Sequence, residues 1–247
     1  MVADVIARSP IRPVGRDAPK RLFAESDEAF DVLSATSLNF WGKHDDILTE
    51  TVGPDLFVTQ FNDKSGNGHD MPSRVGASST GKRARYQASN VDANNRPTVL
   101  WTDNLNKEVY WNTTTGFDVK EVVAVMAWVS ISGNSTFPRD VQLFATTGNQ
   151  FPIRFTQNAA TLNAASDVPT VSINGGPQTS TLLPLTLSVC RFTYPAVRNG
   201  FWSFGGQPGA DTPGWQGPIS ELLVFSQDMS ASYWNGLLAH LTTQYGI

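Results

Sequence analysis

The chain of 247 residues is 40% hydrophobic but only 16% charged, and its net charge is −4. This length and hydrophobic content suit one large domain with its own core, while the weak negative charge excludes a broad basic surface for nucleic acid. No apolar segment reaches the ~18 residues of a membrane helix, so we expect neither a nucleic-acid partner nor a membrane partner.

Residues 1–21 differ in composition from the rest of the chain. Three prolines prevent a continuous helix, and five basic side chains oppose only Asp4 and Asp17: Arg8, Arg12, Arg16, Lys20 and Arg21. We expect an extended arm whose basic side chains dock on acidic or main-chain acceptor groups of a partner, with a disordered tail as the alternative. Charge and proline also interrupt the apolar centre that a signal peptide needs, so we expect synthesis in a cytoplasm.

The acidic segment 22–31 follows the arm and either forms a short helix or pairs with a basic arm. We therefore assign residues 1–31 to the arm and this segment, and residues 32–247 to one domain. Turn-rich stretches in that domain separate apolar or alternating segments, which predict strands at 37–42, 56–61, 97–101, 108–112, 122–131, 141–146, 151–157, 170–174, 186–194 and 219–226. Many strands at close spacing favour a sandwich or jelly roll, and thus an all-β class, over an α/β fold.

Two of these segments carry further expectations. The apolar run 121–131 predicts a strand that is buried on both faces. Cys190 lies in the apolar segment 186–194 and is expected to act as a small buried hydrophobe. A catalytic thiolate is the alternative, but none of the chain's three histidines belongs to a recognisable motif that would supply its base.

The stretch FNDKSGNGHD, residues 61–70, has the spacing of a calcium loop at its start, because Asp63, Ser65 and Asn67 alternate in front of Gly68. A calcium loop of a helix–loop–helix motif also needs a bidentate Glu at its twelfth position, where this chain has Arg74. A plain turn is therefore predicted, in which Asp63 and Ser65 bind backbone N–H groups and the glycines adopt positive φ. We expect no metal ion and no cofactor.

A single helix is predicted at the end of the chain. Ser230 is a suitable N-cap, and an apolar stripe follows at helical spacing, formed by Trp234, Leu237, Leu238, Leu241 and Tyr245. Gly246 follows where a helix commonly ends. The stripe is expected to pack against the sandwich.

Five short motifs together resemble the concanavalin A-like (laminin-G-type) jelly-roll domains that are common in bacterial surface proteins and phage structural proteins. They are Asp63 to Gly68, Arg96–Pro97, Asn174–Gly175, Gly217 to Phe225 and Tyr245–Gly246–Ile247. The resemblance spans residues 32–247 and implies a jelly-roll sandwich. Within the alternating strand after Gly217, Glu221 is expected to bond a nearby turn or a basic side chain such as Arg96.

Some members of this broad fold are glucanases that carry two carboxylates on one strand. Here only Asp118 and Glu121 come close, at a spacing that points them to opposite faces, so we expect no catalytic residues and no enzyme. Sugar binding remains, in which aromatic rings stack on sugar faces and Asn or Asp binds hydroxyl groups. The candidates are Asn199, Trp202, Asp211, Trp215, Tyr110 and Trp111, although we expect most of these rings to belong to the core.

The resemblance and the arm together suggest a non-catalytic structural protein of a phage virion, either a head decoration or a tail or fibre component. Residues 1–21 would bind other virion proteins, sister subunits would form a trimer, and the lectin-like domain would bind a host-surface glycan. The alternative is a free carbohydrate-binding protein or a glycan hydrolase of the same fold.

Overall fold

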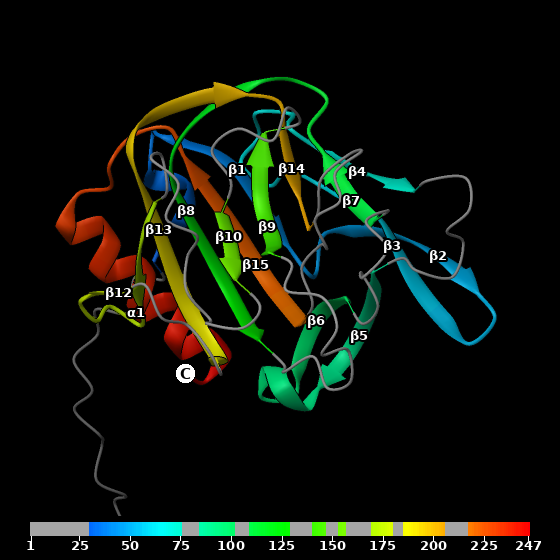
Figure 1. Ribbon diagram of the computed structural model, residues 1–247. Coiled ribbons are helices and arrows are strands. Elements are labelled where there is room, and N and C mark those ends of the chain that lie inside the picture. The colour runs from blue at the N-terminus through cyan, green and yellow to red at the C-terminus, as the bar shows by residue number, and fades with distance from the viewer. Residues whose placement is uncertain are drawn as a thin grey trace, which may run out of the picture.

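The computed structural model describes residues 30–75, 84–101, 109–128, 140–146, 153–156, 169–179, 185–205 and 217–247. These residues form antiparallel β-structure and one C-terminal helix, α1 (Ala231–Tyr245), which confirms the expected all-β class (Figure 1). The basic arm lies outside the described residues, as does most of the acidic segment that follows it. No described helix is long and apolar enough to cross a membrane.

The larger group of strands forms one layer, called sheet A here. Its central strands are β8 and β15, and its order from one side is β12, β11, β13, β8, β15, β6, β5 and β3, while β1 also pairs with β15 and β2 pairs with β3. The strands of sheet A are β1 (Leu38–Lys43), β2 (Ile47–Val52), β3 (Asp55–Phe61), β5 (Arg85–Asn90), β6 (Arg96–Trp101), β8 (Phe117–Trp128), β11 (Thr170–Ile173), β12 (Gln178–Thr179), β13 (Leu185–Gly200) and β15 (Gly217–Phe225).

The second layer, sheet B, has the strand order β4, β7, β14, β9 and β10. The strand β4 joins the two layers, because it pairs with β3 on one side and with β7 on the other. The strands of sheet B are β4 (Met71–Val75), β7 (Val109–Asn112), β9 (Asp140–Thr146), β10 (Ile153–Thr156) and β14 (Trp202–Phe204). All strands predicted from the sequence are present, with ends shifted by a few residues.

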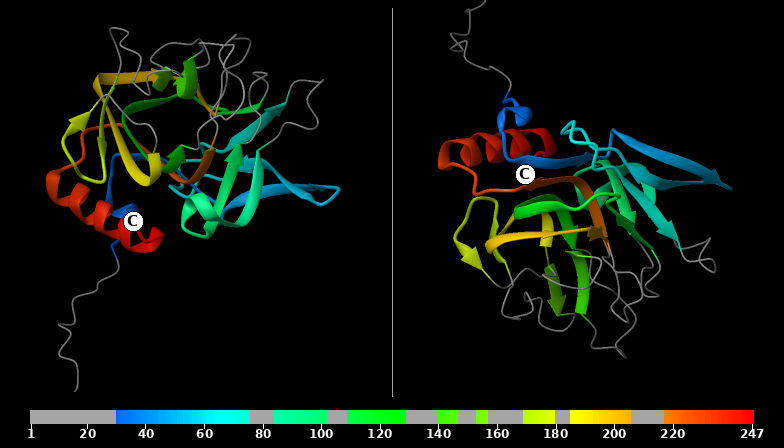
Figure 2. Two further views of the ribbon diagram at one scale, coloured as in Figure 1. Left: turned by 60° about the horizontal axis from the view of Figure 1, so that its bottom comes forward. Right: turned by 90° about the horizontal axis from the view of Figure 1, so that it is seen from above.

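Sheet A is covered on both faces. One face packs against sheet B around Val122, Ala124 and Met126, and the other packs against α1 around Val123 and Val125. Figure 2 shows the resulting three layers in its right-hand view, with the helix on one side of sheet A and β9 and β10 on the other. The prediction that 121–131 is buried on both faces is confirmed for the described part of that run.

The burial pattern of strand β15 differs from the one expected from the sequence. An alternating strand was expected after Gly217, but every residue from Gly217 to Phe225 is buried. The physical reason is its central position, because Leu222 and Val224 face sheet B while Leu223 and Phe225 face the helix.

The helix α1 begins and ends where the sequence predicts. The Ser230 side chain accepts a hydrogen bond from the Tyr233 N–H, and Gly246 ends the helix in the left-handed region with φ of 68°. The side chains of Trp234, Leu237, Leu241 and Tyr245 are buried, whereas Leu238 is half-buried. Leu238 instead lies against the turn at Gly175. A Cβ added to Gly175 would stand 2.5 Å from Leu238 Cδ2.

The stretch at 61–70 is a turn held by one carboxylate. Asp63 Oδ1 accepts the N–H groups of Ser65 and Trp41, and its Oδ2 accepts the N–H of His69. Gly66 and Gly68 both have positive φ. The turn prediction is thus confirmed, and the described residues contain no group of three His, Cys, Asp or Glu side chains that could hold a metal ion.

Candidate functional site

Two glutamates on neighbouring central strands are fully buried under the helix, Glu121 on β8 and Glu221 on β15. Phe225 pairs with Glu121 and Glu221 pairs with Val125, so the two carboxylates lie diagonally apart on the same face of sheet A. Buried carboxylates are rare unless their oxygens are hydrogen-bonded. Their partners therefore indicate what each one does.

Glu221 is enclosed by neutral donors near the end of α1. Its Oε1 accepts the indole N–H of Trp41 at 2.7 Å, and its Oε2 accepts the Tyr245 hydroxyl at 2.7 Å and the Gln244 amide at 3.3 Å. Burial, and then the nearby Glu221 charge, raises the pKa of Tyr245 far above its ordinary value, so the hydroxyl stays a donor. The expectation that Glu221 binds a nearby turn or a basic side chain such as Arg96 was wrong, because its hydrogen-bond partners are neutral side chains of β1 and α1 that occupy both oxygens.

Glu121 lies at the other end of the helix and has a charged partner. Its Oε1 accepts Arg191 Nη2 at 2.5 Å and the Thr193 hydroxyl at 3.3 Å. Its Oε2 accepts the N–H of Met229 at 3.0 Å, just before the helix begins. Arg191 is 20% exposed, and its guanidinium lies 4.9 Å from the centre of the Trp234 ring.

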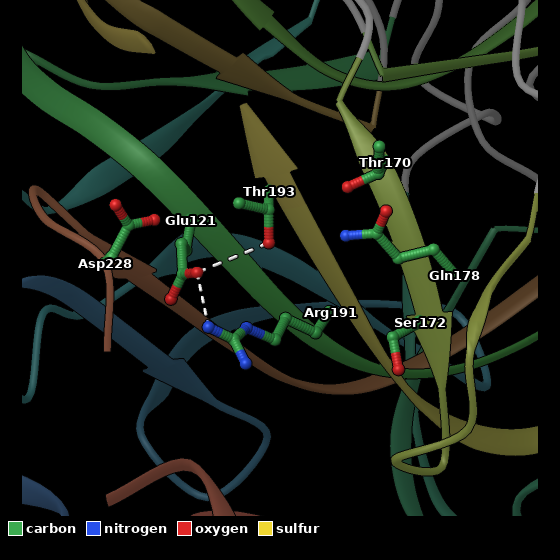
Figure 3. Close-up of a pocket in the computed structure, with 7 residues that line it drawn as sticks. All are labelled: Glu121, Thr170, Ser172, Gln178, Arg191, Thr193 and Asp228. Carbon is green, nitrogen blue, oxygen red and sulfur yellow. Dashed lines mark hydrogen bonds and ion pairs between the residues drawn. The ribbon is translucent and has the colours of Figure 1, made fainter. Parts of the chain in front are cut away.

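The Glu121–Arg191 pair forms one wall of a small polar pocket of about 180 Å³. Figure 3 shows its lining, with Gln178 extending its amide toward Thr193 from the opposite side. The lining comes from β8, β11, β12, β13 and the loop before α1: Glu121, Thr170, Ser172, Gln178, Arg191, Thr193 and Asp228. Asp228 at the mouth is 66% exposed and forms an ion pair with Lys120.

Several polar groups of this pocket are available to a ligand. Neither the Gln178 amide nor the Thr170 hydroxyl has a hydrogen-bond partner among the described residues, and Arg191 Nε is buried without one. These donors lie beside acceptors on Thr193 and Asp228. A ligand hydroxyl group both donates and accepts, so this mixture suits a polyhydroxylated ring better than an apolar one.

Each carboxylate of the pocket has a partner among the described residues, and only Asp228 keeps an oxygen, Oδ2, outside its ion pair. Both oxygens of Glu121 accept hydrogen bonds, and Asp228 is paired with Lys120.

Cys190 is fully buried in the core, and burial raises the pKa of its thiol to about 12, which keeps it protonated.

The structure separates the glycan-binding candidates taken from the sequence. Asn199 is exposed on β13, whereas Trp202 is fully buried, stacks on Phe144 at 4.7 Å and donates its indole N–H to Phe117 O. This corrects the expectation for Trp202, because its ring has no face open to a ligand. The backbones of Tyr110 and Trp111 lie in β7 of sheet B, and Asp211 and Trp215 lie outside the described residues.

The pocket itself was missed by sequence reasoning. Its residues lie between positions 121 and 228 and share no motif. The one available signal was Glu121 at the start of the longest apolar run, because a carboxylate in a strand buried on both faces needs a partner.

The chain was compared with known family models, curated proteins and solved structures. The resemblance to concanavalin A-like domains stays a prediction from the sequence, since the comparisons supply no relative that would support it. No known family model, no curated protein and no solved structure matches this chain.

Proposed function

We propose that this chain is a non-catalytic, lectin-like protein that binds one sugar ring of a glycan in the pocket beside Glu121. The observation that carries the proposal is an open polar pocket in which the two charged residues of one wall, Glu121 and Arg191, form an ion pair with each other. Glu121 and Arg191 compensate each other, which leaves Gln178, Thr170 and Thr193 to select for hydroxyl groups.

The size of the pocket supports a small polar ligand. Pockets for drug-sized molecules usually enclose about 300–1,000 Å³, and this one encloses about 180 Å³. A single sugar ring at the end of a chain suits such a space, with the rest of the glycan continuing into solvent. The exposed Asp228 at the mouth can accept a further hydroxyl.

The hydrolase alternative requires two carboxyl groups on opposite sides of the scissile bond, one of them able to give up a proton. Among the described residues, the two carboxylates at this pocket are Glu121 and Asp228. Glu121 already accepts three hydrogen bonds, one of them from a guanidinium. We therefore favour binding over hydrolysis.

We also propose that the two-layered sandwich is a concanavalin A-like jelly roll, and that the protein is a phage head decoration or a tail or fibre component. The antiparallel layers support the first proposal, as does the pairing of β1 with β15, the first and last strands among the described residues. The basic, proline-rich residues 1–21 support attachment to other virion proteins, with a trimer of sister subunits as the first expectation. The pocket fits a free carbohydrate-binding protein equally well.

A glycan array probed with the full chain tests the binding proposal. We expect a defined set of bound glycans and a loss of about tenfold in signal for Gln178→Ala, because one or two hydrogen bonds disappear. Gln227→Ala is the matched control, since Gln227 is exposed and does not line the pocket. The proposal fails if the wild-type chain binds no glycan, or if both variants bind as it does.

Deletion of residues 1–21 tests the attachment proposal separately. We expect a folded domain that binds glycans but no longer joins the particle and loses its trimeric mass in light scattering. Normal incorporation of the truncated chain would contradict the role of the arm and leave the pocket unaffected.

A further inference from the structure

We propose that a second sugar-contact surface lies where β13 bends toward β14, formed by Phe201 together with Asn199 and Asp118. The proposal rests on the proposed glycan binding but concerns a different part of the surface. It assigns this surface to a neutral sugar ring that presents an apolar C–H face and at least one free hydroxyl.

The backbone brings these residues to one face. β13 runs along sheet A and then bends across the end of the sandwich toward β14 (Figure 1). In the bent part Asn199 pairs with Asp118 and Gly200 pairs with Phe117. Phe201 directly follows the last residue of β13, and alternation continued past that end, with Trp202 buried, places Phe201 on the same face as Asn199 and Asp118, while Phe117 is buried on the other face.

Phe201 offers an open aromatic face. Its side chain is 52% exposed, and no described ring packs against it. Gly116 lies against the backbone at this bend, where an added Cβ would stand 3.3 Å from Gly200 O and 3.8 Å from Phe201 N. An exposed phenyl ring suits stacking against the flat C–H face of a sugar.

The side chains of Asn199 and Asp118, beside the ring, have hydrogen-bond acceptors that no described residue uses. Asn199 Nδ2 donates to Asp118 Oδ1 at 2.7 Å. Among the described residues, Asp118 Oδ2 and Asn199 Oδ1 have no hydrogen-bond partner. Both atoms are acceptors, so they select for ligand hydroxyl donors, and the Asp118 charge disfavours a carboxylated sugar.

The surface is held in place from below. Trp202 follows Phe201 directly and is fixed in the core, with its backbone N–H donated to Thr113 Oγ1 and its indole N–H donated to Phe117 O, both at 2.9 Å. Asn39 Nδ2 binds the Asp118 carbonyl at 2.7 Å. A ring carried by such a fixed backbone loses little freedom when it binds a ligand, which favours affinity.

The test uses the full chain in a Gln178→Ala background, which weakens binding in the pocket about tenfold. Saturation-transfer difference NMR would be recorded with the methyl glycosides of glucose, galactose and mannose, and with N-acetylneuraminic acid as the acidic probe. We expect a neutral glycoside to bind through its ring C–H groups, Phe201→Ala to weaken this binding about tenfold, and Phe201→Trp to retain it. Leu48→Ala is the control, because Leu48 on β2 is 51% exposed.

Each outcome separates this surface from the pocket. Binding that survives Gln178→Ala but is lost with the added Phe201→Ala supports the second surface. Binding that Gln178→Ala abolishes completely overturns the second surface and leaves the pocket proposal intact. Binding that Phe201→Ala leaves unchanged, or a preference for the acidic probe, also overturns it. If the wild-type chain binds no glycan, both proposals fail.

Discussion

The two ends of helix α1 rest on buried carboxylates that have opposite kinds of surroundings. At the C-terminal end, neutral donors from Trp41, Tyr245 and Gln244 enclose Glu221. At the N-terminal end, Glu121 pairs with Arg191 and borders an open pocket. Both join the helix to sheet A, but only the second leaves polar groups within reach of a ligand.

This difference shows how one element can serve stability and binding at separate places. A carboxylate enclosed on all sides contributes through its three hydrogen bonds and lies out of reach of a ligand. A carboxylate beside a partly exposed arginine keeps the backbone before the helix in place while its partner faces the pocket. The comparison predicts that substitutions at the Glu221 end change stability and that substitutions at the Glu121 end change binding as well.

The largest effect is expected for Glu221→Ala. It leaves the half-buried Trp41 indole, the buried Tyr245 hydroxyl and the Gln244 amide without their acceptor, so the free energy of unfolding should fall by about 3–5 kcal/mol. Urea denaturation of the full chain measures this loss. Glu221→Gln, which keeps one acceptor oxygen, should cost clearly less, and a loss below about 1 kcal/mol for Glu221→Ala would refute the role of Glu221.

A smaller effect is expected for Glu121→Ala. Arg191 loses its carboxylate, but it retains the Trp234 ring and reaches solvent through the pocket, so the loss should be about 2–3 kcal/mol. The same denaturation experiment measures it, and glycan binding should fall with it because Arg191 is no longer fixed. A larger loss of stability for Glu121→Ala than for Glu221→Ala would contradict the comparison.

The turn beside the pocket gives a third test. Gly175 has φ of 73° and lies against Leu238 of the helix, whereas Gly53 has φ of 62° and nothing within 4 Å of an added Cβ. We expect Gly175→Ala to cost about 2 kcal/mol and Gly53→Ala about 1 kcal/mol, because only the first adds a clash to the backbone strain. Equal losses in thermal denaturation would show that Leu238 moves aside freely.

The smallest effect is a pH dependence at the Glu221 end. Burial lowers the pKa of His44 below its ordinary value of 6.5, although a hydrogen bond with the Ser220 carbonyl opposes part of this change. Below pH 6.5 the unfolded chain therefore binds a proton that the folded chain does not, and the free energy of unfolding falls as the pH falls. His44→Asn should flatten this slope between about pH 7.5 and pH 5.5 in urea denaturation. An unchanged slope would contradict the assignment to His44.

The sequence predicted the strands that are apolar and the helix that has both caps, because these signals are local. It missed five strands: β2 and β5, whose polar and exposed residues lack a clear alternation, and the short strands β4, β12 and β14. It also offered Trp202 as a candidate sugar contact and overlooked Phe201, because a loop-rich composition does not show which of two adjacent rings faces the core. The pocket could not be predicted, since its residues meet only when β8, β11, β12 and β13 pair.

The most direct test of the account applies the same substitution to the two ends of the helix. Gln178→Ala and Gln244→Ala would be compared by isothermal titration with a glycan selected on the array and by urea denaturation. We predict that Gln178→Ala weakens glycan binding about tenfold with little change in stability, and that Gln244→Ala lowers stability by about 1 kcal/mol without changing binding. Unchanged glycan affinity in Gln178→Ala, or an equal loss of affinity in both variants, would contradict the assignment of binding to the Glu121 end.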